Sequence, residues 1–406
     1  MIVCKFGGSS VCSKEALLHV KRIIEKNKER KFIIISAIGK RNSKDNKLTD
    51  LLQKAIEDRK SSSFNITFQN IKLKMLNFAN ELEINPHSII NFELFKKQIA
   101  TLSVSKEFIL SRGEYFTALI CAQFLNAKFL DSKDLIVTSL NGRIDLLSTK
   151  QNLTKINQSD RYVIPGFYCA NDRGEITLLG RGGSDTTGAI ISACTNADLY
   201  ENYTDVSGLL TIDNKLSQKA KTITQLSSGQ LLNCVNGGAN VYCQGAIPFF
   251  TEKLAIKNTF NNNQKFTVIN KKSSFYYFDS IKKYIVFSNT KHIEKSRFIR
   301  GIFKHFTNDD NIIQEAIYIR KRLYLAIKTN QNFNSVDGIK LSLYGKYYNQ
   351  SLSILKEVCK YNNIDIQIKK LPQPSIKTTI NFFGCINKTF INEIISVLET
   401  KNTSSH

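Results

Sequence analysis

The sequence predicts an α/β/α sandwich built on a mainly parallel sheet, followed by two smaller α+β modules. Apolar, strand-like runs alternate with helical runs at the start of the chain, and glycine-rich loops join them. Beyond a polar stretch at residues 261–283, the order of elements changes to strand, helix, strand, strand. Strict alternation of strands and helices is typical of a parallel sheet covered on both faces.

The alternation starts with predicted strands at 2–6 and 32–37 and predicted helices at 14–28 and 49–59. Apolar residues then recur at helical spacing, which predicts three helices: 71–82, 88–102 and 115–125. A further helix is expected over 186–197, and five more strands complete the sheet: 128–130, 161–164, 176–179, 201–206 and 247–250. Because ligands bind at the carboxyl ends of such strands, we expect the functional residues there.

The polar stretch marks the expected end of a first domain at residues 1–270. After it the sequence predicts strands and helices in a repeated order: strand 284–287, helix 294–306, strands 312–319 and 323–327, strand 339–344, helix 350–361, strands 364–369 and 378–383, and helix 389–398. The repeat predicts two modules, at 284–330 and 338–400. The first lacks its second helix, because residues 329–337 are few and polar.

Composition restricts the class of protein. The 406 residues contain no run of 18 apolar residues, so no transmembrane helix is predicted, and the first strand leaves no room for a leader peptide. Nine cysteines without a C-x-x-C pair or metal-ligand spacing indicate reduced thiols in a cytoplasmic protein. The net charge of +23 comes from scattered lysines without a basic block, so nucleic-acid binding is not predicted.

Two glycine-rich loops carry the chemistry. The stretch Thr177-Leu-Leu-Gly-Arg-Gly-Gly-Ser-Asp-Thr-Thr-Gly-Ala189 joins a strand-like run to a helical run. Glycines let backbone N–H groups approach a ligand, and a helix N-terminus favours anions. Arg181 can bind a carboxylate or phosphate through two hydrogen bonds, and Asp185 can orient cations or cap the helix. Lys5, at the end of the first strand, precedes a similar loop at Gly7-Gly8. Neither loop has the Walker or dinucleotide pattern.

Four motifs together resemble one family. Their order is Lys5-Phe-Gly-Gly-Ser-Ser-Val11, Ser111-Arg-Gly-Glu114 opening a helix, Gly180-Arg-Gly-Gly-Ser-Asp-Thr-Thr187 and Thr204-Asp-Val-Ser-Gly208. This order resembles the aspartate kinases of the amino-acid kinase fold family over about residues 1–270. The later repeat resembles the paired ACT modules of those enzymes only in architecture.

The resemblance implies a cytoplasmic enzyme that uses ATP and Mg²⁺ to phosphorylate the side-chain carboxylate of L-aspartate. The product, 4-phospho-L-aspartate, would feed diaminopimelate, lysine, threonine and methionine synthesis. The ACT-like modules would form a homodimer. Neither nucleic acid nor membrane is an expected partner.

The resemblance also assigns roles to single positions. Lys5 matches the lysine that meets the transferred phosphoryl group, and Asp185 matches the aspartate that organises catalytic lysines. Nine positions match ATP-binding residues: Lys5, Gly7, Gly8, Ser9, Thr204, Asp205, Leu210, Lys215 and Asn240. Five match aspartate-binding residues: Ser36, Thr49, Glu114, Arg181 and Ser184. Thr49 could alternatively cap a helix that starts at Asp50. No protein metal ligand is implied.

Several positions depart from the family pattern. Leu210 replaces an aromatic residue of the adenine pocket, Lys215 replaces an arginine, and Asn240 replaces a lysine that contacts ATP phosphates. Arg320-Lys321 replaces a Ser-Glu effector signature, so weak inhibition by lysine is predicted. Two alternatives stay open: a kinase of the same fold for another acid such as glutamate, and a non-catalytic regulatory homologue. Asn240 favours the second alternative, whereas the intact Lys5 and Asp185 disfavour it.

Overall fold

The computed structural model describes residues 1–101, 103–249, 253–261, 264–270, 275–279, 282–287, 312–319, 322–328, 335–344, 352–362, 364–370 and 377–400. The chain forms two compact units. The first unit consists of Met1–Leu209, Thr224–Asn236 and Asn240–Lys271. The second consists of Leu210–Ile223, Gly237–Ala239 and Lys272–His406, so it includes two segments that interrupt the first unit in sequence.

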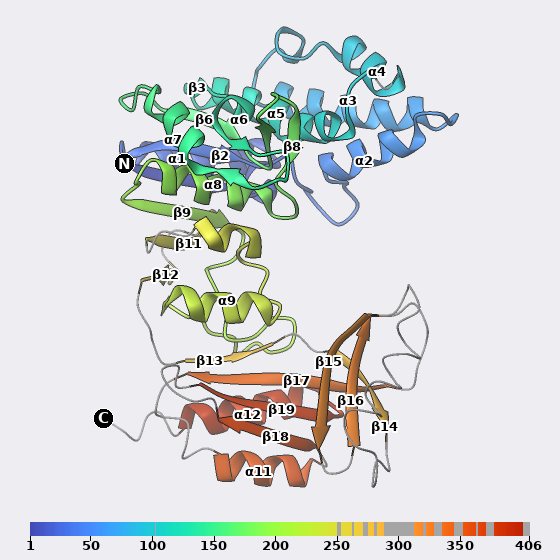
Figure 1. Cartoon of the computed structure of the whole chain (residues 1–406), viewed down its shortest axis with the longest axis vertical. Helices are drawn as coiled ribbons and strands as arrows, with labels where there is room; N and C mark the ends of the chain where they lie inside the picture. The colour runs from blue at the N-terminus through green and yellow to red at the C-terminus, as the bar shows by residue number, and fades with distance from the viewer. Residues whose placement is uncertain are drawn as a thin grey trace. The chain divides into compact units, whose positions relative to one another are not determined.

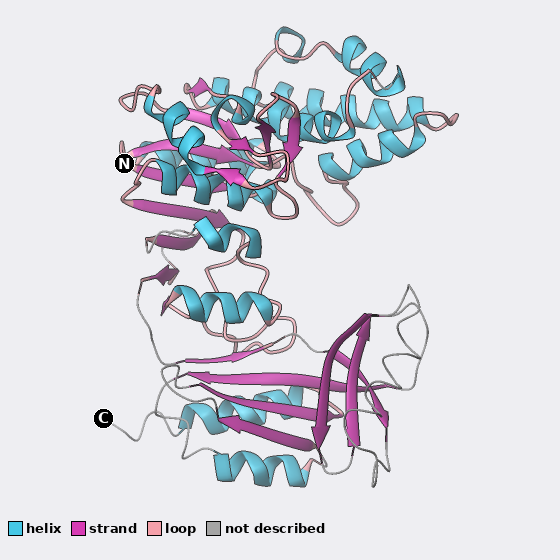
Figure 2. Ribbon diagram, in the orientation of Figure 1, coloured by secondary structure: helices cyan, strands magenta, loops and turns pink. Residues whose placement is uncertain are grey.

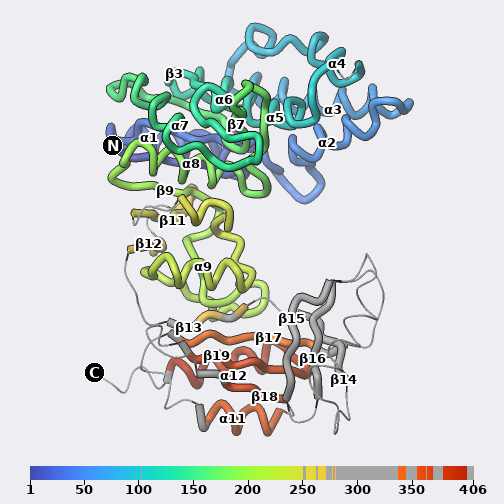
Figure 3. The backbone as a smooth tube through the Cα atoms, in the orientation of Figure 1, coloured from blue at the N-terminus to red at the C-terminus, as the bar shows by residue number. Residues whose placement is uncertain are grey.

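An eight-stranded sheet organises the first unit (Figure 1). Its order is β10 (Gln225–Leu226), β12 (Thr267–Ile269), β11 (Leu254–Asn258), β9 (Leu199–Thr204), β1 (Ile2–Phe6), β2 (Arg30–Ile35), β6 (Tyr162–Pro165) and β3 (Lys128–Phe129). Only the pair formed by β11 and β12 is antiparallel, so the predicted, mainly parallel α/β sheet is confirmed. Figure 3 traces the backbone through this sheet, in which β1 and β9 are paired although they are far apart in sequence, with Lys5 opposite Asn202.

The two faces of this sheet are covered by different helices (Figure 2). Successive side chains of a strand point to opposite faces. Cys4 and Phe6 join the core cluster that contains Leu17 and Val20 of α1 (Lys14–Glu25). Lys5 faces the other way, towards α8 (Gly183–Cys194). The predicted helices at 14–28 and 186–197 are thus confirmed, although α8 begins three residues earlier than predicted.

Four helices follow β2: α2 (Leu48–Asp58), α3 (Phe64–Glu81), α4 (Phe92–Thr101) and α5 (Lys106–Phe124). The prediction that Ser111–Glu114 opens a helix is wrong, because α5 begins at Lys106 and Ser105 accepts a hydrogen bond from Phe108 N as its N-cap. The motif therefore lies inside the helix. Polar and small residues of α5, Ser111 to Glu114, are buried together with apolar ones, so the helical periodicity is weak at this position. None of the helices in the described ranges is long and apolar enough to cross a membrane.

Two predicted strands differ from the structure. Residues 176–179 were expected in the main sheet, but β8 (Ile176–Leu178) pairs with β7 (Tyr168–Asn171) in a separate four-stranded sheet with β4 (Val137–Thr138) and β5 (Ile144–Asp145). Residues 247–250 were expected to be a strand, but Gln244–Phe249 is a 3₁₀ helix, η3, and contains Pro248. The main-sheet strand at this point is β11, which begins at Leu254.

The remaining short elements of the first unit are η1 (Gly8–Val11), η2 (Pro86–Ser88), α6 (Ser132–Leu135), α7 (Leu146–Thr154) and α9 (Ser228–Asn236). The turn η1 follows β1 directly, and Gly7 precedes it in an extended conformation. The glycine loop at Gly7-Gly8 is therefore a tight turn.

The second unit has an antiparallel sheet in the order β15 (Ile312–Ile319), β16 (Arg322–Lys328), β14 (Lys282–Phe287), β17 (Ser335–Tyr344), β19 (Lys377–Gly384) and β18 (Asp365–Lys370). A short strand, β13 (Phe275–Phe278), pairs with β17. The helices are α11 (Leu352–Tyr361) and α12 (Lys388–Thr400). These elements confirm the predicted strands and helices, whereas the predicted helix at 294–306 lies outside the described residues.

The segment Leu210–Ile223 is part of the packing of the second unit. Ile212 is 1% exposed and belongs to the core cluster that contains Ile339 and Leu341 of β17. Ser217 Oγ bonds to Asn392 Oδ1 at 2.6 Å, and Lys221 Nζ lies 2.7 Å from Glu399 Oε1, both on α12. This segment therefore depends on α12 and β17 for its conformation.

Gly188 allows α8 to pack closely on β9. A Cβ at this position would lie within 2.6 Å of Tyr200 Cζ, and Tyr200 is buried. We predict that Gly188→Ala lowers the free energy of unfolding by about 1–3 kcal/mol, because an added methyl group overpacks this interface. The matched control is Gly229→Ala in α9, where a Cβ meets no atom within 4 Å. Guanidinium unfolding measures both, and equal stability of the two variants would contradict the packing argument.

Candidate active site

An ion pair between Lys5 and Asp185 forms the centre of the candidate site. Lys5 Nζ lies 2.7 Å from Asp185 Oδ1, and both side chains are nearly buried, at 11% and 12% exposure. Lys5 comes from β1, and Asp185 lies in the first turn of α8. Gly182, in the left-handed conformation with φ 72°, is the N-cap of α8, so Asp185 does not serve as the cap. The sequence placed these two residues in separate loops, and the structure brings their side chains together.

Asp185 is held by donors from two other parts of the chain. Asn202 Nδ2 on β9 donates to Asp185 Oδ1 at 3.2 Å, and the backbone N–H of Cys243 donates to Oδ2 at 3.0 Å. Charge-assisted hydrogen bonds of this kind hold the carboxylate in one orientation. Sequence reasoning missed Asn202 and Cys243. The alternation of side chains along β9 could have indicated Asn202, because it places this residue on the same face as Lys5.

The glycine turn after β1 is fixed by close backbone packing. Gly39 N donates to Gly8 O at 3.1 Å, and Gly7 N donates to Tyr203 O at 3.3 Å. A Cβ on Gly8 would lie 2.9 Å from Ala37 O, and a Cβ on Gly39 would lie 2.9 Å from Ser9 N. The turn therefore requires glycine at both positions, and the requirement at Gly39 was also missed. Lys5 Nζ lies 3.6 Å from the position of a Cβ on Gly7, so the amino group sits directly under the turn.

A second group of predicted residues gathers around Gly113 of α5. A Cβ on Gly113 would lie 3.3 Å from Ala37 Cβ and 3.7 Å from Thr49 Cγ2, so α5 closely approaches both the segment after β2 and the first turn of α2. Glu114 follows directly, and Ser36 follows β2, with its N–H bonded to Phe6 O. Thr49 and the residues next to Ser36 and Glu114 therefore meet at Gly113, and the aspartate-binding role assigned to all three stays a prediction. The alternative that Thr49 caps a helix at Asp50 is wrong, because α2 begins at Leu48 with Lys47 as its N-cap.

Glu114 is a buried carboxyl group with unused hydrogen-bonding capacity. It is 4% exposed, and its Oε2 has no hydrogen-bond partner among the described residues. Burial raises the pKa of Glu114 to about 8, and the backbone N–H of Ala37 offsets only part of that effect. Burial favours the neutral form, so a cation placed beside Oε2 would lower this pKa again. Glu114 is therefore suited to accept hydrogen bonds from a ligand ammonium group.

Ser184 links the Lys5–Asp185 ion pair to the residues gathered around Gly113. The position of a Cβ on Gly166 would lie 2.6 Å from Ser184 Cβ, and Gly166 N donates to Ile35 O at the end of β2. Ser184 is buried beside Asp185, close to the strand end that precedes Ser36. Arg181 is exposed in the loop between Gly180 and Gly182, and its guanidinium forms no ion pair with any described residue. Its backbone carbonyl accepts a hydrogen bond from Cys243 Sγ at 2.9 Å.

The predicted nucleotide-binding residues fall into two sets. Thr204 ends β9, and its Oγ1 donates to Asp205 Oδ1 at 3.1 Å, so both residues lie at the same sheet edge as Lys5. Ser9 lies in η1 and is half-buried. Asn240 is exposed in the first unit. Leu210 and Lys215 belong to the second unit and are not part of the unit that carries the ion pair. The Arg320-Lys321 pair lies outside the described residues.

Polar atoms without partners surround Asp185. Asn202 Oδ1, Thr186 Oγ1 and Tyr242 Oη are buried and lack hydrogen-bond partners in the described part of the chain. Buried polar groups are normally paired with protein or water, so this side of the ion pair can accept a polar ligand or ordered water. In the described ranges no three His, Cys, Asp or Glu side chains group as a metal-binding cluster. The site thus combines one cation, backbone donors and a separate carboxyl group.

Comparison with known proteins gives three findings. A sequence profile described as the Amino acid kinase family matches residues 1–255. The curated relatives include Aspartokinase 3 of Bacillus subtilis (strain 168), 31% identical over 293 residues, and the Aspartokinase of Helicobacter pylori, 33% identical over 135 residues. The match to the Bacillus subtilis protein covers 68% of this chain and 64% of that protein, so the chain spans somewhat less than two thirds of the relative's length.

Solved structures of similar fold cover almost the whole chain. The Clostridium acetobutylicum aspartate kinase matches with a TM-score of 0.80 and 24% identity, covering 100% of both chains. The Escherichia coli aspartokinase III in complex with lysine and aspartate matches with a TM-score of 0.76 and 15% identity, covering 98% of this chain and 99% of that chain. At these identities the matches show a shared fold. They include the region of the predicted ACT-like modules.

The raised pKa of Glu114 predicts how stability depends on pH. In the unfolded chain a glutamate titrates near pH 4.3, whereas burial raises the pKa of Glu114 to about 8. Between these values the folded state binds the extra proton, so Glu114 lowers stability progressively as pH rises from about 4.3 to about 8. We predict that Glu114→Gln is more stable than the unmodified protein at pH 8 and that the difference disappears near pH 4.

Chemical unfolding at several pH values measures this difference. The matched control is Glu83→Gln, because Glu83 is fully exposed and its pKa is lowered by Lys14. A Glu114→Gln variant whose relative stability does not change between pH 4 and pH 8 would contradict the assignment of a neutral, buried carboxyl group.

Proposed function

The chain belongs to the amino acid kinase family, and from this premise we propose that it transfers the γ-phosphoryl group of ATP to the side-chain carboxylate of L-aspartate. The observation that carries the proposal is the Lys5–Asp185 ion pair under the glycine turn, next to the separate Glu114 subsite. The names of the aspartokinase relatives support the choice of acid. The product would be 4-phospho-L-aspartate, which would feed diaminopimelate, lysine, threonine and methionine synthesis.

The chemistry needs charge placement more than a strong base. The side-chain carboxylate of aspartate is ionised near pH 7 and can attack the γ-phosphorus directly. The γ P–O bond to ADP breaks as the new acyl phosphate bond forms, so negative charge shifts onto the phosphoryl and leaving oxygens. Lys5 and the backbone N–H groups of Gly8 and Ser9 would stabilise that charge, because they are fixed before the reaction. Asp185 acts by holding Lys5 in position.

The acid would bind on the Glu114 side of the turn. Glu114 would accept hydrogen bonds from the substrate ammonium, and the exposed guanidinium of Arg181 would bind a carboxylate. Ser36, Thr49 and Ser184 offer hydroxyl groups around the same space. A subsite that pairs both charged ends of an amino acid discriminates against N-acylated acids, because acylation removes the ammonium that Glu114 needs.

The nucleotide would bind at the ends of β1 and β9. Gly7, Gly8 and Ser9 would contact its phosphates, and Thr204 and Asp205 would lie near its sugar and base. The phosphates of ATP would hold Mg²⁺, which usually keeps several waters in such sites. When bound, Mg²⁺ neutralises charge on the phosphate oxygens.

We propose a cytoplasmic enzyme that forms a homodimer through its ACT-like modules. The described residues include no membrane-spanning helix, which is consistent with this location. The resemblance implies that such modules associate with one another, and the antiparallel sheet of the second unit would supply the surface.

A panel of acids tests the acceptor. With ATP, Mg²⁺ and hydroxylamine to trap acyl phosphate, we predict turnover with L-aspartate and at least about tenfold lower kcat/KM with L-glutamate or N-acetyl-L-glutamate.

Lys5→Met should lower kcat by about 100-fold or more, because it removes a charge contact to the transition state. Lys28→Met, which removes one exposed positive charge far from the turn, is the matched control. Faster turnover with glutamate would replace the proposed substrate, and near-normal kcat in Lys5→Met would reject the catalytic role.

Asn240 provides a further prediction. If it lies near the ATP phosphates, Asn240→Lys should tighten ATP binding or raise kcat about 5- to 30-fold, in line with charge-assisted hydrogen bonds of about 1–2 kcal/mol. Initial rates at varied ATP measure the change. The neutral variant Asn240→Gln keeps the amide and serves as the control. Identical KM for ATP in both variants would show that this position does not contact the nucleotide.

A further inference from the structure

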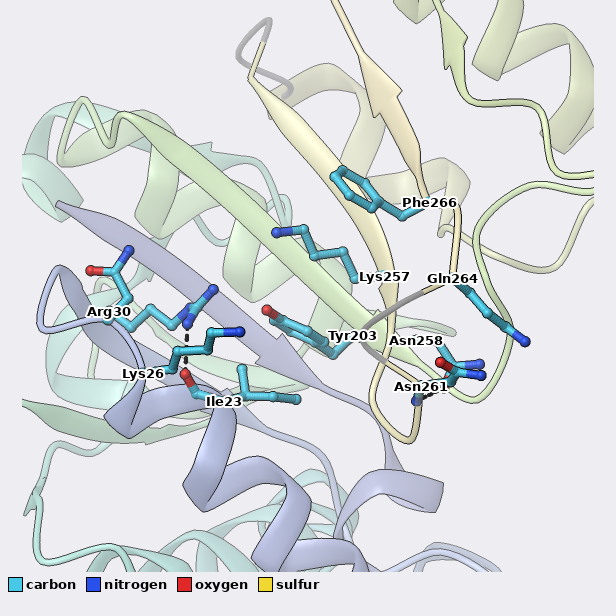
Figure 4. Close-up of a pocket in the computed structure, with 10 residues that line it drawn as sticks. Ile23, Lys26, Arg30, Tyr203, Lys257, Asn258, Asn261, Gln264 and Phe266 are labelled. Atoms are coloured by element: carbon cyan, nitrogen blue, oxygen red, sulfur yellow. Dashed lines mark hydrogen bonds between the residues drawn. The ribbon is translucent and has the colours of Figure 1, made fainter.

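A second pocket lies in the first unit, on the face of the sheet that α1 covers. It has a volume of about 280 Å³, and its lining residues come from α1, β2, β9, β11 and the segment before β12: Ile23, Lys26, Asn27, Arg30, Tyr203, Lys257, Asn258, Asn261, Gln264 and Phe266. Figure 4 shows the amino group of Lys257 pointing towards the side of Arg30, while the side chains of Asn258, Asn261 and Gln264 gather at the other end.

A buried ion network supports the cationic side of this pocket. Glu201 of β9 is 1% exposed, and Arg30 donates to both of its oxygens, at 2.6 and 3.1 Å. Lys257 Nζ lies 2.5 Å from Glu201 Oε1, and Tyr203 Oη bonds to Glu201 Oε2 at 3.2 Å. These contacts hold the pKa of Glu201 at about 2, so it stays ionised. Arg30 also donates to Ile23 O at 2.6 Å, which fixes its position at the end of α1.

The pocket has more positive charge than the network neutralises. Within the network, Glu201 is the one carboxylate that pairs with these cations, whereas three cationic side chains line the cavity: Lys26, Arg30 and Lys257. Lys26 is exposed and forms no ion pair with any residue in the described ranges. Arg30 and Lys257 are only 11% and 21% exposed, so their charges are screened less than those of surface lysines. A preorganised cationic pocket of this kind favours an anion.

The cationic end of the pocket lies on the opposite face of the sheet from the Lys5–Asp185 pair. Lys257 is paired with Tyr203 across β9 and β11, and Glu201 is paired with Cys4 across β9 and β1. Lys5 and Asn202 are the alternate residues of the same strands, and they point to the α8 face, where Asp185 lies. The sheet itself therefore stands between the two sites, and a ligand in the pocket cannot contact the Lys5–Asp185 pair.

We propose that this pocket binds a small metabolite that carries a phosphate or carboxylate group. The oxyanion would lie against Lys26, Arg30 and Lys257, since each offers N–H donors. The volume of about 280 Å³ exceeds that of a single inorganic oxyanion, and Ile23, Tyr203 and Phe266 provide apolar and aromatic surface for the rest of the ligand. Lys257 Nζ lies 4.9 Å from the centre of the Phe266 ring, which places this ring next to the cationic end.

Calorimetric titration with defined anions tests the proposal on the full chain at constant ionic strength. The probes are inorganic phosphate, glycerol 2-phosphate and succinate, with sodium chloride as the screening control. We expect saturable binding of at least one oxyanion, and the order of affinities distinguishes a phosphate-bearing ligand from a carboxylate. Lys26→Met and Lys257→Met should each weaken binding about tenfold or more, as expected for a lost charge-assisted hydrogen bond. Glu201 remains paired with Arg30 in Lys257→Met.

Two further variants decide where the anion binds. Lys28→Met removes an exposed charge close to Lys26 that does not line the pocket, and it should bind like the unmodified protein. Lys5→Met should also keep full affinity, because Lys5 lies on the opposite face. No saturable binding of any probe would overturn the proposal. If Lys28→Met weakened anion binding as much as Lys26→Met does, the binding would be an effect of net charge and the proposal would be overturned. Loss of binding in Lys5→Met would assign the anion to the active site instead.

Discussion

The pairing of β1 with β9 is the constraint on which the candidate site depends. It sets Lys5 opposite Asn202, so both side chains reach Asp185 from the same face of the sheet. A nearly buried ion pair is costly unless its remaining hydrogen-bonding groups are satisfied. Asn202 and the Cys243 backbone supply those bonds, and the left-handed Gly182 directs the first turn of α8 towards them. A shift of one residue in this register would turn Lys5 to the α1 face and break the arrangement.

Much of the first unit could be predicted from the sequence, because strands β1, β2 and β6 are short, mostly apolar runs that end in glycine or polar loops. The parallel order of these strands predicts that Lys5 and Ser36 lie at the same end of the sheet, whereas the contact of Lys5 with Asp185 becomes visible only in the structure. The start of α5 could not be predicted from periodicity, because the helix is buried on several sides at Ser111–Glu114. The N-cap at Ser105 was the usable signal. The separate sheet of β8 depends on antiparallel pairing with β7, which no local pattern indicates.

Residues missed by sequence reasoning share a physical reason. Asn202, Gly39 and Cys243 act through backbone position or through contact with a distant strand, not through a reactive side chain. Gly39 allows two strand-end turns to touch, and the Cys243 N–H is a backbone donor that any residue except proline could supply. Their importance becomes visible only when the strand ends are placed together. Conversely, Leu210 and Lys215 were assigned to the nucleotide by the family resemblance alone, and the structure groups them with the second unit.

The segment Leu210–Ile223 also bears on how this chain can be divided. Its Ile212 completes the core beside β17, and its Ser217 and Lys221 bond to α12. A fragment that ends at the last strand of the first unit would keep this segment but lose the core that it fills, and would expose Ile212 to water. A fragment that begins after that strand would in turn lack part of its own core. The two units are compact, but neither corresponds to a continuous stretch of the gene. Dividing the gene at a single point would therefore leave each expressed unit incomplete.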